Sequence, residues 1–96
     1  MPRLRRQAPP DNGRYAYAYA VALNDFGQAK EALRVLESAW KRQPYNLDVL
    51  VGLAYFAAAQ GRRESALDFA TQLRELDPEN AEYPRMVETI QKSPTR

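Results

Sequence analysis

The sequence predicts an all-α fold in which five helices form antiparallel pairs that stack side by side. Three short turns at a regular spacing support this prediction. The turn Pro44–Asn46 has a counterpart thirty-four residues earlier, at Pro10–Asn12, and another thirty-four residues later, at Pro78–Asn80. Other residues recur at the same interval, namely Gly27 and Gly61, Ala32 and Ala66, Leu33 and Leu67, and Ala20 and Ala54. A fixed period in this range is typical of helical repeats, each of which buries its apolar face against its neighbours.

Each Pro-x-Asn turn ends one helix and begins the next. Proline cannot continue a helix, because it lacks an N–H group and its ring clashes with the preceding turn. Asparagine, two residues later, can accept a hydrogen bond from the first N–H groups of the following helix. The turns divide the chain into a flexible or truncated end of a preceding repeat at 1–12, a first repeat at 13–46, a second repeat at 47–80, a closing helix at 81–92 and a tail at 93–96.

The first helix is expected over 13–26, although this segment also fits another structure. Tyr15, Tyr17 and Tyr19 alternate with alanine, and alternation of this kind is typical of a β-strand. Alanine, however, has the highest helix propensity, and the asparagine before the segment and the glycine after it are suited to cap a helix. The aligned segment 47–60 shows no alternation, so we predict a helix at both places.

Three further helices follow from apolar residues spaced three and four positions apart. The segments 28–42 and 62–76 each carry one apolar face and end before a turn proline. The closing segment begins at Ala81 or at Pro84, since both starts are compatible with the proline ring. Its apolar face holds Tyr83, Met86, Val87 and Ile90, and its polar face holds Glu82, Arg85, Glu88 and Gln91. A polar outer face is what the end of a stack requires.

The first residues of the chain also have a place in the period. Residues 4–8 correspond to 38–42, the last turns of a second helix, which predicts that the chain begins partway through a repeat of a longer array. The alternative is a basic N-terminus without regular structure.

The positive charge of the chain lies in the same first residues. Residues 1–12 hold three arginines and one aspartate, whereas residues 13–96 hold eleven basic and eleven acidic residues. A neutral body argues against a broad nucleic-acid surface. Arg3, Arg5 and Arg6 provide only a weak, salt-sensitive attraction to nucleic acids or anionic membranes.

The composition offers little for catalysis. The chain has no histidine and no cysteine, so the usual metal ligands and nucleophiles are missing. Glu64 and Asp68 lie one helical turn apart, but the arginines beside them indicate a solvated face. The four glycines are isolated and form no phosphate-binding loop. We therefore expect no enzyme, no cofactor, no metal and no small-molecule substrate. No apolar run reaches about 18 residues, so no membrane span is expected.

The period and the small residues resemble those of the tetratricopeptide repeat family, whose pattern runs W-x2-L-G-x2-Y, then A-x3-F, then P. The pattern falls on Ala16, Tyr19, Ala20, Leu23, Ala32, Leu36 and Pro44, and again on Leu50, Leu53, Ala54, Ala57, Ala66, Ala70 and Pro78. Most of the family's aromatic positions hold smaller residues here, and the lost volume is expected to be restored by Phe26, Trp40, Phe56 and Phe69. The resemblance covers about residues 13–92 and implies a right-handed α-α superhelix of two repeats and a closing helix.

The resemblance also implies a binding surface. In this family the first helix of each repeat lines a concave groove that takes an extended or helical peptide of a partner protein. The residues expected in the groove are Arg14, Tyr17, Val21, Asp48, Val51, Tyr55 and Arg85, and further Asp25, Ala59, Glu82 and Thr89. Tyrosine suits such a surface because it presents a large rigid ring and a hydroxyl group. The alternative is that Tyr17 and Tyr55 pack on one another across the groove.

Two functions follow from these observations. The first is a protein-interaction scaffold whose groove binds a partner peptide. The second is self-association as a homodimer, because an open N-terminal end of the stack would expose Tyr15 and Tyr19, and exposed apolar patches tend to find partners. The residues assigned to the interior or to contacts between units are Tyr15, Tyr19, Leu23, Trp40, Phe56 and Phe69.

Overall fold

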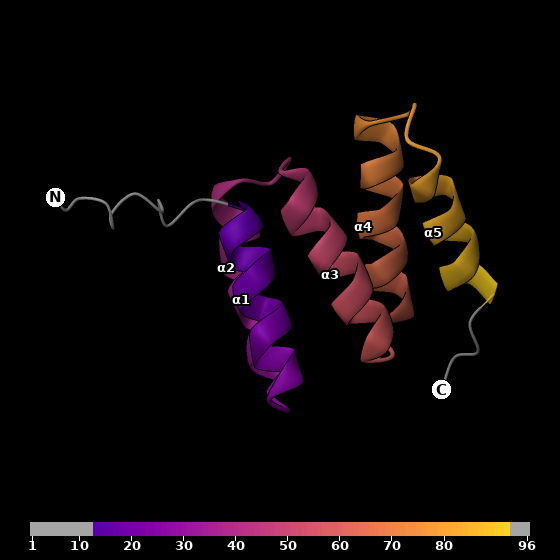
Figure 1. The fold of residues 1–96 in the computed structure, drawn as a ribbon. Helices are drawn as coiled ribbons and strands as arrows, with labels where there is room; N and C mark the ends of the chain where they lie inside the picture. The colour runs from indigo at the N-terminus through magenta and orange to yellow at the C-terminus, as the bar shows by residue number, and fades with distance from the viewer. Residues whose placement is uncertain (1–12, 93–96) are drawn as a thin grey trace, which may run out of the picture.

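A computed structural model describes residues 13–92, which fold into five helices and contain no strand. The helices are α1 (Gly13–Asp25), α2 (Ala29–Arg42), α3 (Leu47–Ala59), α4 (Arg63–Leu76) and α5 (Glu82–Lys92). Each helix packs on the next one along the chain, and α1 also packs on α3 (Figure 1). The predicted all-α stack of five helices is confirmed, with helix bounds within one or two residues of those expected. The predictions for 1–12 and 93–96 lie outside the described residues.

The asparagines of the Pro-x-Asn turns form hydrogen bonds to the first turns of the helices that follow them. The side chain of Asn46 accepts a hydrogen bond from the Val49 N–H at 3.2 Å, and that of Asn80 accepts one from the Glu82 N–H at 2.9 Å. The capping role predicted for Asn46 is confirmed, since Asn46 is the N-cap residue of α3. Asn80 lies two residues before α5 and bonds to its first N–H group, and Asn12 lies outside the described residues. α5 begins at Glu82, between the two predicted starts. Its proline then falls in the first turn, where a missing N–H leaves no helical bond unmade.

Glycine ends the first helix of each pair. Gly27 has a φ of +81°, a left-handed conformation that glycine adopts without steric cost. The N–H of Gly27 bonds to the Asn24 carbonyl at 3.0 Å, and the N–H of Gln28 bonds to the Leu23 carbonyl at 2.9 Å. These two bonds satisfy carbonyl groups that the end of a helix otherwise leaves free. The same φ and the same two bonds recur at Gly61, one period later.

The interior of the stack is apolar and contains small residues where helices come closest. The buried residues are Ala20, Ala32, Leu33, Leu36, Ala39, Val49, Leu50, Leu53, Ala54, Ala57, Ala66, Ala70, Leu73, Tyr83, Val87 and Ile90. The alanines expected at contacts within a pair, Ala20 with Ala32 and Ala54 with Ala66, are all fully buried. Their small side chains allow the two helices of a pair to approach each other closely. The predicted apolar face of the closing helix is also confirmed, since its four residues are buried or half-buried.

An aromatic contact joins the second helices of the two pairs. The rings of Trp40 on α2 and Phe69 on α4 meet edge to face, with centroids 5.5 Å apart and planes at 85°. Both side chains are partly buried and pack against the core, as do Leu23 and Phe56. The assignment of these four residues to the interior or to contacts between units is therefore confirmed.

Three aromatic residues do not lie where the sequence predicted. Tyr15 is 62% exposed, Tyr19 is 58% exposed and Phe26 is 81% exposed. Tyr15 and Tyr19 are thus more than half exposed, so their assignment to the interior or to contacts between units is wrong for the residues that the structure describes. Phe26 follows the last residue of α1 and adds no volume to the core.

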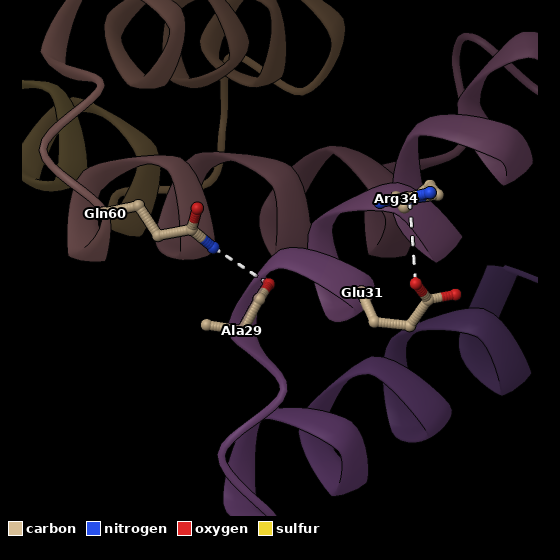
Figure 2. Close-up of polar contacts among 4 residues, drawn as sticks. All are labelled: Ala29, Glu31, Arg34 and Gln60. Carbon is tan, nitrogen blue, oxygen red and sulfur yellow. Dashed lines mark hydrogen bonds and ion pairs between the residues drawn. The ribbon is translucent and has the colours of Figure 1, made fainter.

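Polar side chains form hydrogen bonds between helices that belong to different pairs, and between the second pair and the closing helix. Gln60 donates a hydrogen bond from Nε2 to the carbonyl of Ala29, at 2.9 Å, which joins the end of α3 to the start of α2 (Figure 2). Arg63 donates to the carbonyls of Ile90, at 3.3 Å, and Gln91, at 2.7 Å. A cation at the C-terminal end of α5 is favourable, because the helix dipole is negative there.

We expect Gly27→Ala to lower the free energy of unfolding by about 1–2 kcal/mol, the cost of a left-handed conformation for a residue with a Cβ. No atom lies within 4 Å of the added methyl group, so the loss measures backbone conformation alone. Gly61→Ala should cost the same, because its surroundings are equally open. Urea denaturation provides the measurement, and Ser65→Ala, at an exposed helical position, provides a control that should stay within about 0.5 kcal/mol of the wild type. Unchanged stability in both glycine variants would contradict this account of the helix ends.

We also expect stability to fall at alkaline pH because of Tyr83. Burial raises the pKa of the Tyr83 phenol above its ordinary value, and the carboxylates of Asp77, Asp48 and Glu82 raise it further. The unfolded chain therefore loses this proton first, at its ordinary pKa near 10, and the contribution of Tyr83 to stability declines as the pH rises from there through the folded pKa.

The measurement is the urea midpoint of the wild type and of Tyr83→Phe between neutral and strongly alkaline pH. The variant lacks the titrating hydroxyl, so its midpoint should fall less steeply at the alkaline end. Parallel curves for the two proteins would show that Tyr83 does not titrate differently in the folded state.

Candidate functional site

A hollow of about 240 Å³ lies between α3 and α5, and we call it the α3–α5 hollow. It is lined by Tyr55, Ala58, Glu82, Arg85, Met86, Thr89 and Ile90. Two features of the sequence produce it. On α3 the residue that lines the hollow one turn after Tyr55 is Ala58, whose small side chain leaves space there. Meanwhile α5 packs chiefly on α4, through contacts such as Tyr83 with Leu73, and so does not fill that space.

The α3–α5 hollow has an apolar floor and a polar rim. Ile90 is buried and Met86 is half-buried, and together they form the floor. Tyr55 is 52% exposed and presents both its ring and its hydroxyl group. Glu82 and Arg85 are exposed on the first turns of α5 and carry opposite charges. An apolar recess with nearby polar and charged groups can hold an apolar side chain and orient the chain that carries it.

Among the predicted groove residues, the structure brings Tyr55 and Arg85 together in this hollow, with Glu82 and Thr89 beside them. Tyr17 lies elsewhere, at the contact between α1 and α3. A Cβ added to Gly52 would come within 2.9 Å of the Tyr17 ring, so the ring lies directly over that glycine. The alternative in which Tyr17 and Tyr55 pack on one another across the groove stays a prediction.

The remaining predicted residues are spread along α1 and α3. Val51 is half-buried and packs against the cluster of Leu50, Leu73 and Tyr83, so it contributes to the interior. Asp48 is exposed at the start of α3, and its charge helps to raise the pKa of Tyr83. The other two lie on α1, with Arg14 exposed and Val21 half-buried, and both are absent from the hollow's lining. Asp25 and Ala59 are exposed.

Sequence reasoning did not place Ala58, Met86 and Ile90 at the site. Met86 and Ile90 were expected on the apolar face of the closing helix, and that face does supply the floor of the hollow. Ala58 lies three residues after Tyr55, on the same side of α3, and the spacing of a helix could have indicated it. An alanine within a run of alanines carries no functional signal of its own.

The rest of the described surface offers less to a ligand. A second, wide and shallow depression lies around the turn before α2, beside the exposed ion pair of Arg34 and Glu31, whose charged atoms are 3.6 Å apart (Figure 2). Surface pairs of this kind contribute little free energy. Within residues 13–92 no three acidic side chains gather closely enough to hold a metal ion. No helix there combines the length and the apolar character needed to cross a membrane.

Comparison with known proteins identifies the family. A family model described as tetratricopeptide repeat matches residues 23–88, from the end of α1 through most of α5. No curated protein matches the chain. The match covers more than half of the 96 residues, and it agrees with the stacked helix pairs, the buried alanines and the capped turns. The chain belongs to the tetratricopeptide repeat family.

Proposed function

We propose that this protein is an interaction scaffold whose α3–α5 hollow anchors a peptide segment of a partner protein. The tetratricopeptide repeat family is generally a protein–protein interaction module and is typically not enzymatic. The observation that carries the proposal is the convergence of Tyr55, Glu82, Arg85 and Thr89 around an apolar floor. These four residues were expected in the groove from the resemblance to the family, and they come from two different helices.

The size of the hollow supports a peptide over a small molecule. Pockets for drug-sized ligands are about 300–1,000 Å³, whereas this hollow has about 240 Å³ and opens to one side. That volume suits one or two apolar side chains of a longer segment. The ring of Tyr55 would cover such a side chain, and its hydroxyl would bond to the backbone of the segment.

The charges at the rim suggest which segment binds. The guanidinium of Arg85 makes no ion pair or hydrogen bond within residues 13–92, so it can pair with an acidic group of a ligand. Arginine binds carboxylates through two parallel hydrogen bonds, which adds orientation to attraction. We therefore propose a segment with an apolar anchor and an acidic residue close to it.

The division into units belongs to the same proposal. Residues 13–46 and 47–80 would each form one repeat, with 81–92 as the closing helix. The recurrence of the glycine turn and of the asparagine side-chain bond at the same interval supports these boundaries. In this arrangement α3 and α5 occupy equivalent places, so the hollow lies between two neighbouring units.

A second function, self-association through the N-terminal end of the stack, is supported by a separate observation. Tyr15 and Tyr19 are more than half exposed on one side of α1. Large exposed aromatic residues on one face are common at protein–protein contacts. This surface is distinct from the α3–α5 hollow, so the two functions do not exclude each other.

Tyr55→Ala tests the hollow directly. Peptides selected on the wild type from a displayed library of random sequences should lose about tenfold or more in affinity for this variant, a typical cost of removing a central aromatic contact. Tyr45→Ala is the matched control, because Tyr45 is exposed and lies in the turn before α3, outside the hollow. Fluorescence anisotropy of the labelled peptides gives the affinities, and circular dichroism checks folding. Equal binding by wild type and Tyr55→Ala would place the peptide site elsewhere.

Arg85→Glu tests the charge preference. Peptides that bind the wild type should be enriched in acidic residues, and this variant should weaken them about tenfold, since attraction becomes repulsion. Arg74→Glu, an exposed charge reversal on α4, should leave the affinity unchanged. Selected peptides without acidic residues, bound equally by both variants, would show that Arg85 does not recognise the ligand.

A further inference from the structure

We propose that the surface where α3 and α5 begin binds a lysine or arginine side chain of the partner segment. We call this surface the acidic subsite and define it by Asp48, Asp77, Glu82 and Tyr83. The acidic subsite depends on the proposed function above, because one segment would fill both it and the α3–α5 hollow. It adds a basic residue, at a set distance from the apolar anchor, to what that segment must contain.

The acidic subsite continues one wall of the α3–α5 hollow. On α3, Asp48 lies seven positions before Tyr55. On α5, Glu82 lies seven positions before Thr89 and also lines the hollow itself. Seven positions are about two helical turns, so the two residues of each pair share one side of their helix. A segment that leaves the hollow toward the starts of α3 and α5 therefore meets both carboxylates, which are exposed.

A third carboxylate, that of Asp77, belongs to the same end of the stack. α4 ends where α3 and α5 begin (Figure 1). Asp77 follows the last residue of α4, and its N–H bonds to the Leu73 carbonyl at 3.0 Å. Leu73 in turn packs with Leu50 of α3 and Tyr83 of α5. The packing of three helices thus brings their acidic ends together.

A buried tyrosine opens into this cluster of carboxylates. Tyr83 is only 7% exposed, and its hydroxyl group makes no hydrogen bond to another residue within 13–92. The enclosed polar side-chain atom without a partner in that range is Trp40 Nε1, so the Tyr83 oxygen reaches the surface. Burial raises the pKa of the Tyr83 phenol, and Asp77, Asp48 and Glu82 raise it further, as nearby negative charges do. The Tyr83 oxygen can accept a hydrogen bond from a ligand that reaches the carboxylates.

The three carboxylates have no partner of opposite charge in the described part of the chain. None of them forms an ion pair or a side-chain hydrogen bond there. Asp48 and Glu82 lie in the first turns of their helices, where the helix dipole favours a negative charge. Asp77 lies at the opposite end of α4, where the dipole disfavours one. A bound cation would relieve this cost and the repulsion among the three charges.

The cation that fits is a long organic one. Calcium binds its oxygen ligands at about 2.3–2.6 Å, and no three acidic side chains within residues 13–92 gather closely enough to hold a metal ion. Lysine and arginine carry several N–H donors at the end of a flexible chain, so they can bond to carboxylates that stand apart. Val51 is half-buried one turn after Asp48 and offers apolar surface to the aliphatic part of that chain.

The distance between the hollow and the acidic subsite sets the spacing within the segment. Two helical turns correspond to about 10 Å along the helix axis. An extended chain advances about 3.3 Å per residue, so the basic residue stands about three positions from the apolar anchor. The segment is extended because the bond proposed for the Tyr55 hydroxyl needs a backbone group that is not used within a helix.

Peptides selected on the wild type from a displayed library of random sequences test the spacing. They should carry lysine or arginine about three positions from an apolar residue. One such peptide, called the basic peptide, is compared with a copy in which that basic residue is alanine, called the neutral peptide. Selected peptides without a basic residue at two to four positions from the anchor would overturn the acidic subsite.

The double variant Asp48→Asn/Asp77→Asn tests which residues bind the basic side chain. It should bind the basic peptide about tenfold more weakly than the wild type does, and the neutral peptide to within about twofold. Neither residue lines the hollow, so the apolar anchor keeps its contacts. Asp68→Asn, the same change at an exposed position of α4, is the control and should bind both peptides as the wild type does. Fluorescence anisotropy gives the affinities, and urea denaturation checks that the variants fold.

Tyr55→Ala separates the acidic subsite from the hollow. This variant should weaken the basic and the neutral peptide by the same factor, because both share the apolar anchor. Equal affinity of the wild type and the double variant for the basic peptide would overturn the acidic subsite and leave the hollow standing. Binding that depends on the basic residue and ignores Tyr55→Ala would overturn the hollow and leave the acidic subsite. A library that yields no binding peptide would overturn both.

Discussion

The close approach of helices at small residues is the constraint on which the rest of this structure depends. Ala20 and Ala32, and one period later Ala54 and Ala66, are fully buried where the two helices of a pair meet. A larger side chain at any of these positions would separate the helices, because protein interiors are packed without spare volume. Gly52 has the same role between α1 and α3, with the Tyr17 ring and Leu36 against it. The surfaces that remain for binding are set by these contacts.

The fold could be predicted from the sequence because its signals are local. Proline, asparagine and glycine fix the ends of helices through bonds within a few residues, as Asn46 and Gly27 show, and helical spacing sorts apolar from polar faces. The exposure of Tyr15 and Tyr19 could not be predicted in this way. Aromatic residues along one helix face have the same sequence pattern whether or not a neighbouring helix covers that face. Whether a helix face is buried depends on helices that are distant in the sequence.

The candidate site could be predicted in part for the same reason. Tyr55, Glu82, Arg85 and Thr89 were expected from the resemblance to the family, whereas the hollow between them depends on how α5 packs against α4 and on the small side chain of Ala58. Tyr17 shows the opposite case. Its position in the repeat is equivalent to that of Val51, yet its ring rests on a glycine one unit later, a contact that neither residue reveals alone.

The edge-to-face contact of Trp40 and Phe69 has a consequence for how the molecule comes apart. In stacked repeats each unit is held by its neighbours, so cooperativity depends on the strength of the junctions between units. Here the junction between the two pairs includes an aromatic contact in addition to aliphatic packing. Unfolding of either helix pair would take away the aromatic partner of the ring in the other pair. Partly unfolded states that keep one pair intact are therefore less stable. The single tryptophan of the chain lies at that junction, and its emission therefore follows the whole cooperative unit and not one helix alone.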